Sequence, residues 1–270
     1  MTNEIESMQN VREYFDKDSL RWRELYYDKY YASNKVLNDR KNYSITFLSK
    51  YLKPDSRILD AGCGAGEVSL DAVRRGYSVH GIDISEKMIH LCNQTFSKIG
   101  IDSTRYQFTV DDITKGNIPN NSYDGILAIG FLEYQKDELK TLKILHNTLR
   151  SKGILICTGP IKTRITNLFG LGITIENNFS RAYIRNPHMI NMYSLSRFRK
   201  LLESSGFTFI DYKRHGYADF YQLIWLSRLI RKELVTPKRS LMLHNGLTKI
   251  SKIFPIDQFA NDIIVVARKD

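Results

Sequence analysis

The sequence predicts an α/β fold in which a mostly parallel sheet carries helices on both of its faces. Between residues 57 and 158, short apolar runs alternate with amphipathic stretches of about ten to fifteen residues, and that alternation is typical of successive β-α-β units. The first apolar run ends in glycines at alternate positions, Gly62, Gly64 and Gly66, directly before a helical stretch. Such a turn lets the backbone approach a ligand closely.

The individual elements follow from hydrophobic periodicity. Helices are predicted over 67–75, 85–98, 137–150 and 194–205, and Ser85 and Gly100 are suitable as the cap and the stop of the second one. Between and after them we predict seven strands, at 57–61, 77–82, 106–110, 123–129, 154–158, 207–213 and 262–268.

Residues 1–53 are predicted to form a helical arm that precedes the main domain at 54–270. Its helices are expected over 7–32 and 35–52, with Pro54 ending the second. We expect the arm to fold over the site at the strand ends and exclude water, although packing on the back of the sheet is an alternative. The observation behind this is an excess of aromatic residues for a solvated helix: Tyr14, Phe15, Trp22, Tyr26, Tyr27, Tyr30 and Tyr31.

Composition narrows the class of protein. A formal net charge of +11 favours acidic partners such as nucleic acid, anionic lipid headgroups or an acidic substrate. The scattered cysteines Cys63, Cys92 and Cys157 argue against a disulfide framework and against a zinc site, so no metal is expected. The start of the chain lacks the pattern of a signal peptide, and no apolar run reaches ~18 residues. We therefore expect a cytoplasmic protein.

Two carboxylates accompany the glycine turn. Asp60 ends the first predicted strand, and Glu67 stands where a dinucleotide fingerprint would need its third glycine. A carboxylate at position 60 would repel a pyrophosphate but attract a cationic ligand. Asp83 ends the second strand, where a carboxylate can accept hydrogen bonds from ribose hydroxyls. The sequence thus predicts a site for a nucleoside that carries positive charge.

These residues resemble the motifs of the class I S-adenosylmethionine-dependent methyltransferases, and most strongly those of the type 11 branch. D-A-G-C-G-A-G at 60–66 resembles the first motif and G-I-D-I-S-E-K-M at 81–88 the second, and the resemblance spans about residues 20–214. It implies a Rossmann-like, seven-stranded, mostly parallel sheet whose last strand is antiparallel. It also implies S-adenosylmethionine as cofactor and S-adenosylhomocysteine as product.

The same resemblance implies a set of cofactor-binding residues. Residues 111–113 resemble the third motif, in which an acidic residue, here Asp112, meets the adenine amino group and Ile113 gives a backbone contact. Residues 122–126 and 130–134 resemble the fourth, whose residues face the methyl group. The implied cofactor contacts are Asp60, Ala61, Gly62, Cys63, Gly64, Gly66, Asp83, Ile84, Met88, Asp112, Ile113 and Gly130.

Two finer resemblances concern the acceptor. The arm, through 14–16, 21–22 and 26, is similar to the magnesium-protoporphyrin methyltransferases. Residues 187–188, 193 and 198–207 are similar to the ubiquinone-pathway O-methyltransferases, and a histidine that faces the acceptor in that group implies His188 as candidate base. A loop histidine without a role is the alternative. Candidate acceptor contacts are Glu133, Tyr134, Arg181, Tyr183 and Arg185. The arginines would suit an acidic acceptor, unless they belong to a solvated basic loop.

A basic insertion over 217–257 lies before the last strand. Helices are predicted over 220–232 and 247–254, and residues 220–254 carry seven basic residues against one acidic residue, a net of +6. The apolar side of 220–232, which includes Trp225, is either a wall of the acceptor pocket or a peripheral contact with an anionic membrane. Both interpretations hold together if the acceptor is a lipid.

The favoured function is therefore methyl transfer from S-adenosylmethionine to a small-molecule or lipid-associated acceptor, with a hydroxyl oxygen as the preferred acceptor atom. One alternative is an RNA methyltransferase, which the charge of +11 favours. Against it, residues 130–133 read Gly-Phe-Leu-Glu and lack an Asn/Asp-Pro-Pro-aromatic motif that would grip a base. The other alternative is a non-catalytic cofactor-binding protein. The intact Asp60, glycine turn and Asp83 argue against that alternative.

Overall fold

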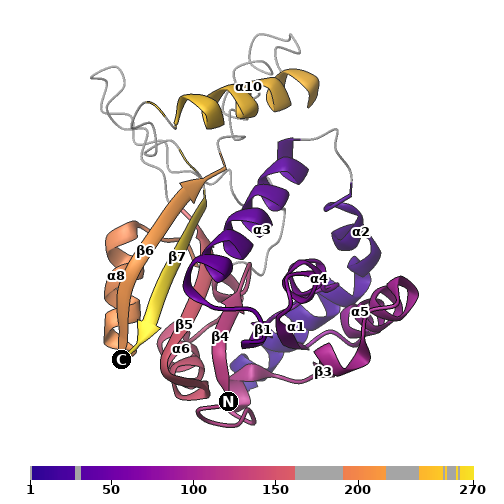
Figure 1. Cartoon of the computed structure of the whole chain (residues 1–270), viewed down its shortest axis with the longest axis vertical. Helices are drawn as coiled ribbons and strands as arrows, with labels where there is room; N and C mark the ends of the chain where they lie inside the picture. Colours follow the sequence, from indigo (N-terminus) through magenta and orange to yellow (C-terminus); the bar gives the residue numbers. More distant parts are fainter. Residues whose placement is uncertain are drawn as a thin grey trace.

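The computed structural model describes residues 2–27, 32–161, 191–216, 237–251, 253, 260 and 262–270. They form a seven-stranded sheet with helices in front of it and behind it (Figure 1). The strand order is β3-β2-β1-β4-β5-β7-β6. The predicted fold class is confirmed.

The first five strands run parallel to one another, because each is joined to the next by a crossover. The last strand, β7, pairs antiparallel with both β5 and β6, as predicted. The strand bounds are β1 (Arg57–Ala61), β2 (Ser78–Asp83), β3 (Tyr106–Val110), β4 (Tyr123–Ala128), β5 (Leu149–Pro160), β6 (Phe207–His215) and β7 (Asp262–Lys269).

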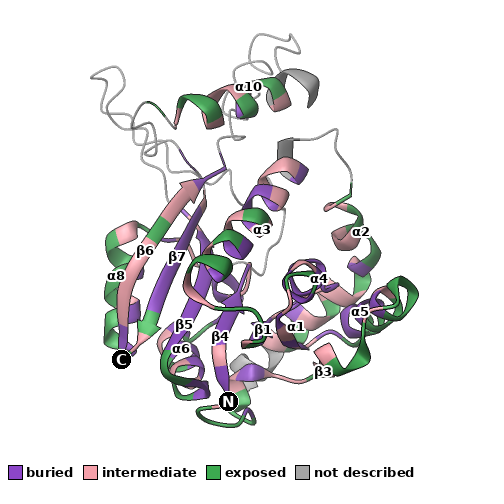
Figure 2. Cartoon of the chain, in the orientation of Figure 1, coloured by how far each residue is buried: buried purple, intermediate pink, exposed green. Residues whose placement is uncertain are grey.

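The core is divided between the two faces of the sheet. On one face, Leu142 and Phe198 pack against strand residues such as Leu59 and Ile126. On the other face, Leu48 and Phe96 pack against Ile58 and Leu127. Strand residues next to each other in the chain thus enter opposite cores, which is the two-residue alternation of a sheet covered on both sides. Figure 2 shows the central strands buried and the outer faces of the helices exposed.

The helices after the glycine turn match the prediction closely. Ser85 caps α5 by accepting a hydrogen bond from the Met88 nitrogen, and Gly100 ends the helix with φ 73°. β5 begins at Leu149 rather than near residue 154, so the preceding helix ends at Thr148. The bounds are α4 (Glu67–Arg74), α5 (Glu86–Ile99), α6 (Glu138–Thr148) and α8 (Leu195–Ser204), with 3-10 turns η1 (Ser103–Arg105), η2 (Ile113–Lys115) and η3 (Leu132–Tyr134).

The N-terminal arm differs from the prediction in one respect. The single helix expected over 7–32 is wrong, because the chain forms α1 (Thr2–Lys17) and α2 (Ser19–Glu24), separated at Asp18. Phe15 and Trp22, one on each helix, pack against the same buried cluster. This packing outweighs the local preference for a continuous helix. The second helix of the arm is α3 (Ala32–Tyr51), which was expected over 35–52.

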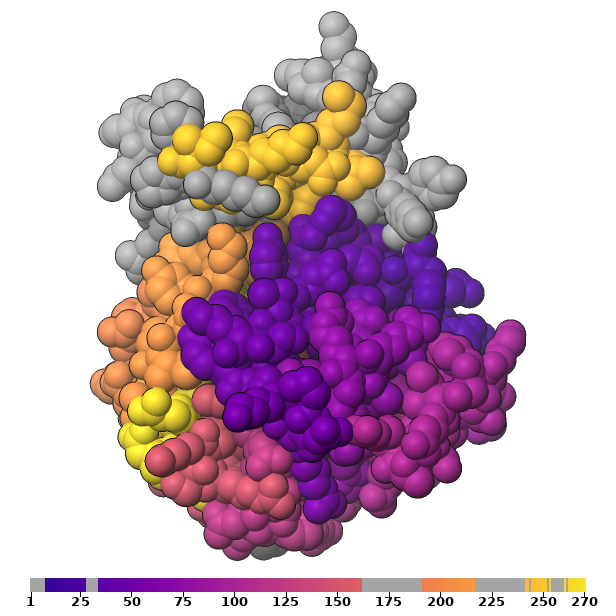
Figure 3. Space-filling model, in the orientation of Figure 1, coloured from indigo at the N-terminus to yellow at the C-terminus, as the bar shows by residue number. Residues whose placement is uncertain are grey.

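The insertion before the last strand contributes α10 (Pro237–Ile250). The helix expected over 247–254 is wrong in its bounds, since the helix begins at Pro237, a residue favoured in a first helical turn. The helix expected over 220–232 lies outside the described residues. α10 packs on α3 through His244, whose buried Nε2 lies 3.0 Å from Asp39 Oδ2. In the space-filling view, α10 lies at the end of the molecule, beyond α3 (Figure 3).

Candidate active site

A cavity of about 1110 Å³, measured with its open mouth, lies at the carboxyl ends of the parallel strands β1 to β4. This is where doubly wound sheets bind ligands, because the strand order reverses between β1 and β4 and the loops that follow these strands diverge. Residues of the arm close its other side, through Val11, Phe15, Trp22 and Tyr26.

The glycine turn after β1 forms the floor of the cavity. Gly62, Gly64 and Gly66 all have positive φ, a backbone conformation that other residues adopt at a cost. A β-carbon added at Gly64 would meet no atom within 4 Å, so this position borders open space. A β-carbon at Gly62 would come within 2.7 Å of the Phe131 ring. The backbone at Gly64 is therefore directly accessible to a ligand.

Asp60 is buried beneath this turn. Its Oδ2 accepts a hydrogen bond of 2.6 Å from the Ser69 hydroxyl. Burial raises the pKa of Asp60 to about 7, against the effect of the Ser69 hydrogen bond, and the neighbouring Asp83 carboxylate adds to the rise. A buried carboxyl group without a cation resists ionisation, so a positively charged ligand beside it would be stabilised.

Asp83, the last residue of β2, is bonded to the loop that follows β1. Its Oδ2 accepts a hydrogen bond of 2.8 Å from the Gly64 nitrogen, and its Oδ1 accepts one of 2.9 Å from the Ser85 nitrogen. Burial raises the pKa of Asp83, although these backbone hydrogen bonds favour the charged form. The carboxylate after β2 thus fixes the loop after β1.

The third strand adds a further acidic pair to the lining. Asp111 and Asp112 follow β3, and Ile113 begins the η2 turn. Asp112 Oδ1 accepts hydrogen bonds from the Thr114 nitrogen at 3.0 Å and from the Thr114 hydroxyl at 2.6 Å. These bonds fix the loop after β3, and Asp112 also lines the cavity.

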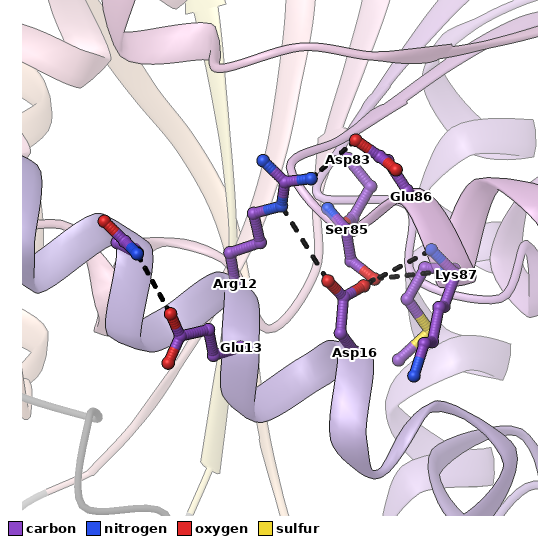
Figure 4. A network of polar contacts seen from close by, with 9 residues as sticks. Arg12, Glu13, Asp16, Asp83, Ser85, Glu86 and Lys87 are labelled. Carbon is purple, nitrogen blue, oxygen red and sulfur yellow. Dashed lines mark hydrogen bonds and ion pairs between the residues drawn. The ribbon is translucent and has the colours of Figure 1, made fainter.

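The arm is held across the start of α5 by charged contacts (Figure 4). Asp16 of α1 accepts a hydrogen bond of 2.5 Å from the Ser85 hydroxyl and one of 3.3 Å from the Lys87 nitrogen. Arg12, one turn earlier, donates to Glu86 at 2.5 Å. These contacts place α1 directly beside the Asp83 loop.

Aromatic packing attaches the arm on the opposite side of the cavity. The Phe15 ring meets the Tyr134 ring edge to face, with centroids 5.3 Å apart, and lies 5.6 Å from the Trp22 ring. Val11 and Tyr134 form a small buried cluster with Phe15. The arm therefore contacts the segment after β4 as well as the segment after β2.

The segment after β4 brings acceptor candidates into the same cavity. Glu133 and Tyr134, on η3, are both buried and both line it. Glu133 Oε1 lies 4.0 Å from Arg40 Nη1 of α3, and the same nitrogen lies 3.9 Å from Asp262 Oδ2 of β7. Sequence reasoning missed Arg40, because an arginine inside an amphipathic helix gives no local sign of a site.

The sequence-predicted residues fall into three groups. Ala61 and Gly66 lie outside the cavity lining: Ala61 is fully buried in β1, and a β-carbon on Gly66 would lie 3.0 Å from Cys92 Sγ. His188, Arg181, Tyr183 and Arg185 lie outside the described residues. The structure brings the remaining cofactor candidates together in one lining: Asp60, Gly62, Cys63, Gly64, Asp83, Ile84, Met88, Asp112, Ile113 and Gly130.

The described part of the chain holds neither a candidate metal site nor a helix that could span a membrane. Among those residues, no group of three or more histidine, cysteine or acidic side chains could hold a metal ion. No helix among them is long and apolar enough to cross a membrane.

Comparison with known proteins agrees with this geometry. A family model described as a methyltransferase domain matches residues 37–212, which is 176 of 270 residues. The magnesium-protoporphyrin O-methyltransferase of Synechocystis is 25% identical over 210 residues, which cover 73% of this chain and 86% of that protein. YqeM of Bacillus subtilis is 28% identical over 122 residues, which cover 44% of this chain and only 48% of that protein.

Solved structures show the same fold. The crystal structure of the Synechocystis magnesium-protoporphyrin IX methyltransferase with bound S-adenosylhomocysteine superposes with a TM-score of 0.63 at 19% identity. The match covers 98% of this chain and all of that chain. The fold and the cavity define a class I S-adenosylmethionine-dependent methyltransferase. The family match settles the assignment: the chain belongs to the methyltransferase-domain family, and S-adenosylmethionine is its cofactor.

Proposed function

We propose that this protein transfers the methyl group of S-adenosylmethionine to a small-molecule or lipid-associated acceptor, with a hydroxyl oxygen as the methylated atom. The observation that carries the proposal is the pairing of Asp83 with the glycine turn, above the buried Asp60. The cofactor carries an ammonium and a sulfonium and no phosphate, so a carboxylate at Asp60 suits it and would repel the pyrophosphate of a dinucleotide.

Each cofactor contact has a proposed role. The open backbone at Gly64 would receive the methionine part of the cofactor, and Asp83 would accept the ribose hydroxyl hydrogen bonds. Asp112 and Ile113 would hold the adenine. Met88 is 2% exposed and packs with Ala65 and Leu91, where it would give the adenine or ribose an apolar surface.

The arm is proposed to act as the lid of this site. Val11, Phe15, Trp22 and Tyr26 line the cavity, and Asp16 and Arg12 attach the arm at the start of α5. Methyl transfer needs little from the protein beyond alignment of the acceptor and exclusion of water. A cover made of aromatic side chains would supply that exclusion.

A small-molecule acceptor is supported by one of the relatives. The Synechocystis relative acts on magnesium-protoporphyrin as an O-methyltransferase, and the chain covers most of its length.

Contact with anionic membranes through 217–257 is a further part of the proposal. The described residues of that segment include the exposed apolar side chains Met242, Ile250 and Ile253, and peripheral membrane proteins commonly use exposed apolar residues beside basic ones.

The cofactor proposal is tested by calorimetry on the full chain. S-adenosylmethionine and S-adenosylhomocysteine should bind with micromolar affinity, about −8 kcal/mol. Binding of a nicotinamide dinucleotide, with no heat from either adenosyl ligand, would overturn it.

The acceptor is then sought by incubating cell extract with the protein and tritiated cofactor, and by separating lipid, small-molecule, RNA and protein fractions. Label in the RNA fraction alone would replace the proposed acceptor class.

A further inference from the structure

We propose that Glu133 is the group that receives a proton from the methyl acceptor, and that the reacting group of the acceptor is a hydrogen-bond donor, a hydroxyl or an amine. The inference rests on the proposed function, because it assumes that the cavity holds both cofactor and acceptor. It adds a residue and a chemical class of acceptor to that function.

The turn that carries Glu133 is held rigidly. The Glu133 carbonyl accepts a hydrogen bond of 3.1 Å from the Asn191 nitrogen. The Asn191 side chain donates to the carbonyls of Leu132 and Gln135, at 3.2 Å and 2.6 Å. Just before the turn, the Gly130 nitrogen donates to the Thr158 hydroxyl at 2.8 Å. The carboxyl group is therefore positioned by a backbone that is fixed on both sides.

One oxygen of this carboxyl group has no hydrogen-bond partner among the described residues. Glu133 is 3% exposed and lines the cavity, and its Oε2 is buried without a hydrogen bond to any described residue. Its other oxygen, Oε1, is 4.0 Å from Arg40 Nη1, which is beyond hydrogen-bond distance. An unpaired buried carboxyl oxygen is costly, so a structure that retains one beside a cavity has room for a donor from a ligand.

The surroundings of Glu133 prepare it to take a proton near neutral pH. Burial raises its pKa to about 7, and the opposing effect of Arg40 is smaller. Arg40 is shared with Asp262 of β7, at 3.9 Å, so one cation serves two carboxyl groups. The thiol of Cys157 on β5 and the hydroxyl of Tyr193 also lie near the carboxyl group. Burial is the main cause of the raised pKa of each, and the charge of Glu133 adds to both. Neither of these groups supplies a positive charge.

The charge of the described lining favours an acceptor group that donates a hydrogen bond. It contains one basic side chain, Arg40, against six acidic ones, which are Asp60, Glu67, Asp83, Asp111, Asp112 and Glu133. An acceptor that presented a carboxylate to this surface would meet repulsion at the point of reaction. A hydroxyl or an amine would instead donate a hydrogen bond to Glu133 Oε2.

The step balances without another reagent. The acceptor oxygen or nitrogen forms a bond to the methyl carbon, and the carbon–sulfur bond breaks with its electron pair going to sulfur. The O–H or N–H bond of the acceptor breaks, and its proton passes to the Glu133 carboxylate. The products are the methylated acceptor, S-adenosylhomocysteine and a neutral Glu133, which loses its proton to solvent when the cavity opens. General-base assistance of this kind contributes typically about 10²–10⁴-fold to rate.

The test follows the Glu133 carboxyl carbon by NMR in the full chain, labelled with ¹³C at the side-chain carboxyl of glutamate and saturated with S-adenosylhomocysteine. The probes are phenol, benzylamine and benzoate, which share one ring and differ in the attached group. The resonance is identified by its loss in Glu133→Gln. Glu203→Gln, the same change at an exposed residue of α8, is the matched control.

We expect the Glu133 resonance to titrate with a midpoint near 7 and to shift with phenol and benzylamine but not with benzoate. Glu133→Gln should remove this resonance from the spectrum, and Glu203→Gln should leave both the resonance and its responses to the three probes unchanged. A midpoint near the ordinary glutamate value of about 4.3, or equal responses to benzoate and phenol, would overturn the proposal.

Two controls separate this inference from the proposed function. If Glu133→Gln does not fold, it will not bind S-adenosylhomocysteine. Glu133→Asp then replaces it: the labelled glutamate resonance is also lost in this variant, but a carboxyl group stays in place. If the wild-type protein does not bind S-adenosylhomocysteine, the proposed function fails. Normal binding of that ligand together with an unresponsive Glu133 refutes only the role of Glu133.

Discussion

The Asp83 carboxylate accepts a hydrogen bond of 2.8 Å from the Gly64 backbone nitrogen, across the gap between two neighbouring parallel strands. The residue proposed to hold the ribose therefore also fixes the turn proposed to hold the methionine part of the cofactor. A change at either residue should affect both contacts together, and the first two predictions follow from this coupling.

Asp83→Asn should weaken the binding of S-adenosylhomocysteine by about 10-fold to 100-fold. The change removes the charge from hydrogen bonds to two backbone nitrogens, and hydrogen bonds to a charged group are worth about 1.5–3 kcal/mol. Calorimetry of the variant measures the loss. Asp55→Asn is the matched control, because Asp55 is exposed, has φ 68°, and lies away from the cavity lining. Equal affinities of the two variants would contradict the role of Asp83.

Gly64→Ala should reduce the affinity for S-adenosylhomocysteine at least tenfold, because the new methyl group would occupy the space that the ligand needs. Gly100→Ala is a matched control. Both glycines have positive φ and open space around an added β-carbon, but Gly100 ends α5 away from the cavity lining. Each variant should lose about 1–2 kcal/mol of stability from backbone strain. If both variants bind the ligand as the wild type does, Gly64 does not border the bound cofactor.

The unliganded protein should lose stability as the pH rises from 5 to 8. Burial raises the pKa values of Asp60 and Glu133 to about 7, above the values of about 3.9 and 4.3 expected in the unfolded chain. The folded state thus holds protons that the unfolded state has released, and their stabilising effect disappears as the pH passes through 7. Urea unfolding at four pH values measures the trend.

Variants separate these two groups from the rest of the chain. Asp60→Asn and Glu133→Gln should each make the pH dependence shallower, whereas Glu203→Gln should not change it. The pKa of Asp39 and that of Asp211 are lowered by side-chain hydrogen bonds despite burial, so these carboxyl groups are already ionised across this range. Burial lowers the pKa of His215 to about 3, which acts in the opposite direction up to the ordinary histidine value of about 6.5. A pH dependence that is the same in the wild type, Asp60→Asn and Glu133→Gln would therefore contradict the prediction.

The arm should control how long the cofactor stays bound. Phe15→Ala removes the ring that contacts both Tyr134 and Trp22, and aromatic pairs are worth about 0.5–1.5 kcal/mol each beyond their buried area. We expect faster dissociation of S-adenosylhomocysteine, measured by stopped-flow displacement, and a larger effect when residues 1–31 are deleted. Leu20→Ala is the control, since Leu20 is 56% exposed on α2. An unchanged dissociation rate after the deletion would mean that the arm is not a lid.

The basic insertion should bind anionic vesicles in a salt-sensitive manner. Changing Arg228, Arg231 and Lys232 to Glu should abolish co-sedimentation with phosphatidylserine-containing liposomes, because each basic residue near an anionic bilayer contributes about 1 kcal/mol. The same charge change at Lys136, Lys140 and Lys143, which are exposed on or just before α6, should have a smaller effect. If equal amounts of protein stay in the supernatant with anionic and with neutral vesicles at low salt, the insertion does not bind membranes. Its remaining role would then be that of a wall of the acceptor pocket.

The sheet and the position of the ligand site at the carboxyl ends of its strands could be predicted from the sequence, because both depend on residues that are close in the chain. Apolar alternation marks a strand within five or six residues, and Ser85 and Gly100 mark the ends of α5 through their own backbone preferences. Asp60 and Asp83 could be located for the same reason. Asp60 is the last but one residue of β1 and Asp83 is the last residue of β2, and the ends of parallel strands meet at one edge of a sheet.

The tertiary structure alone decided how the distant segments meet. Arg40, Glu133 and Asp262 lie on three elements far apart in the chain, and only folding brings them within 4.0 Å. The break at Asp18 was mispredicted because Phe15 and Trp22, one on each side of it, pack against the same buried cluster. The shifted pKa values of Asp60 and Glu133 also come from burial. Burial depends on every segment that packs around a residue, so a local pattern of residues cannot specify it.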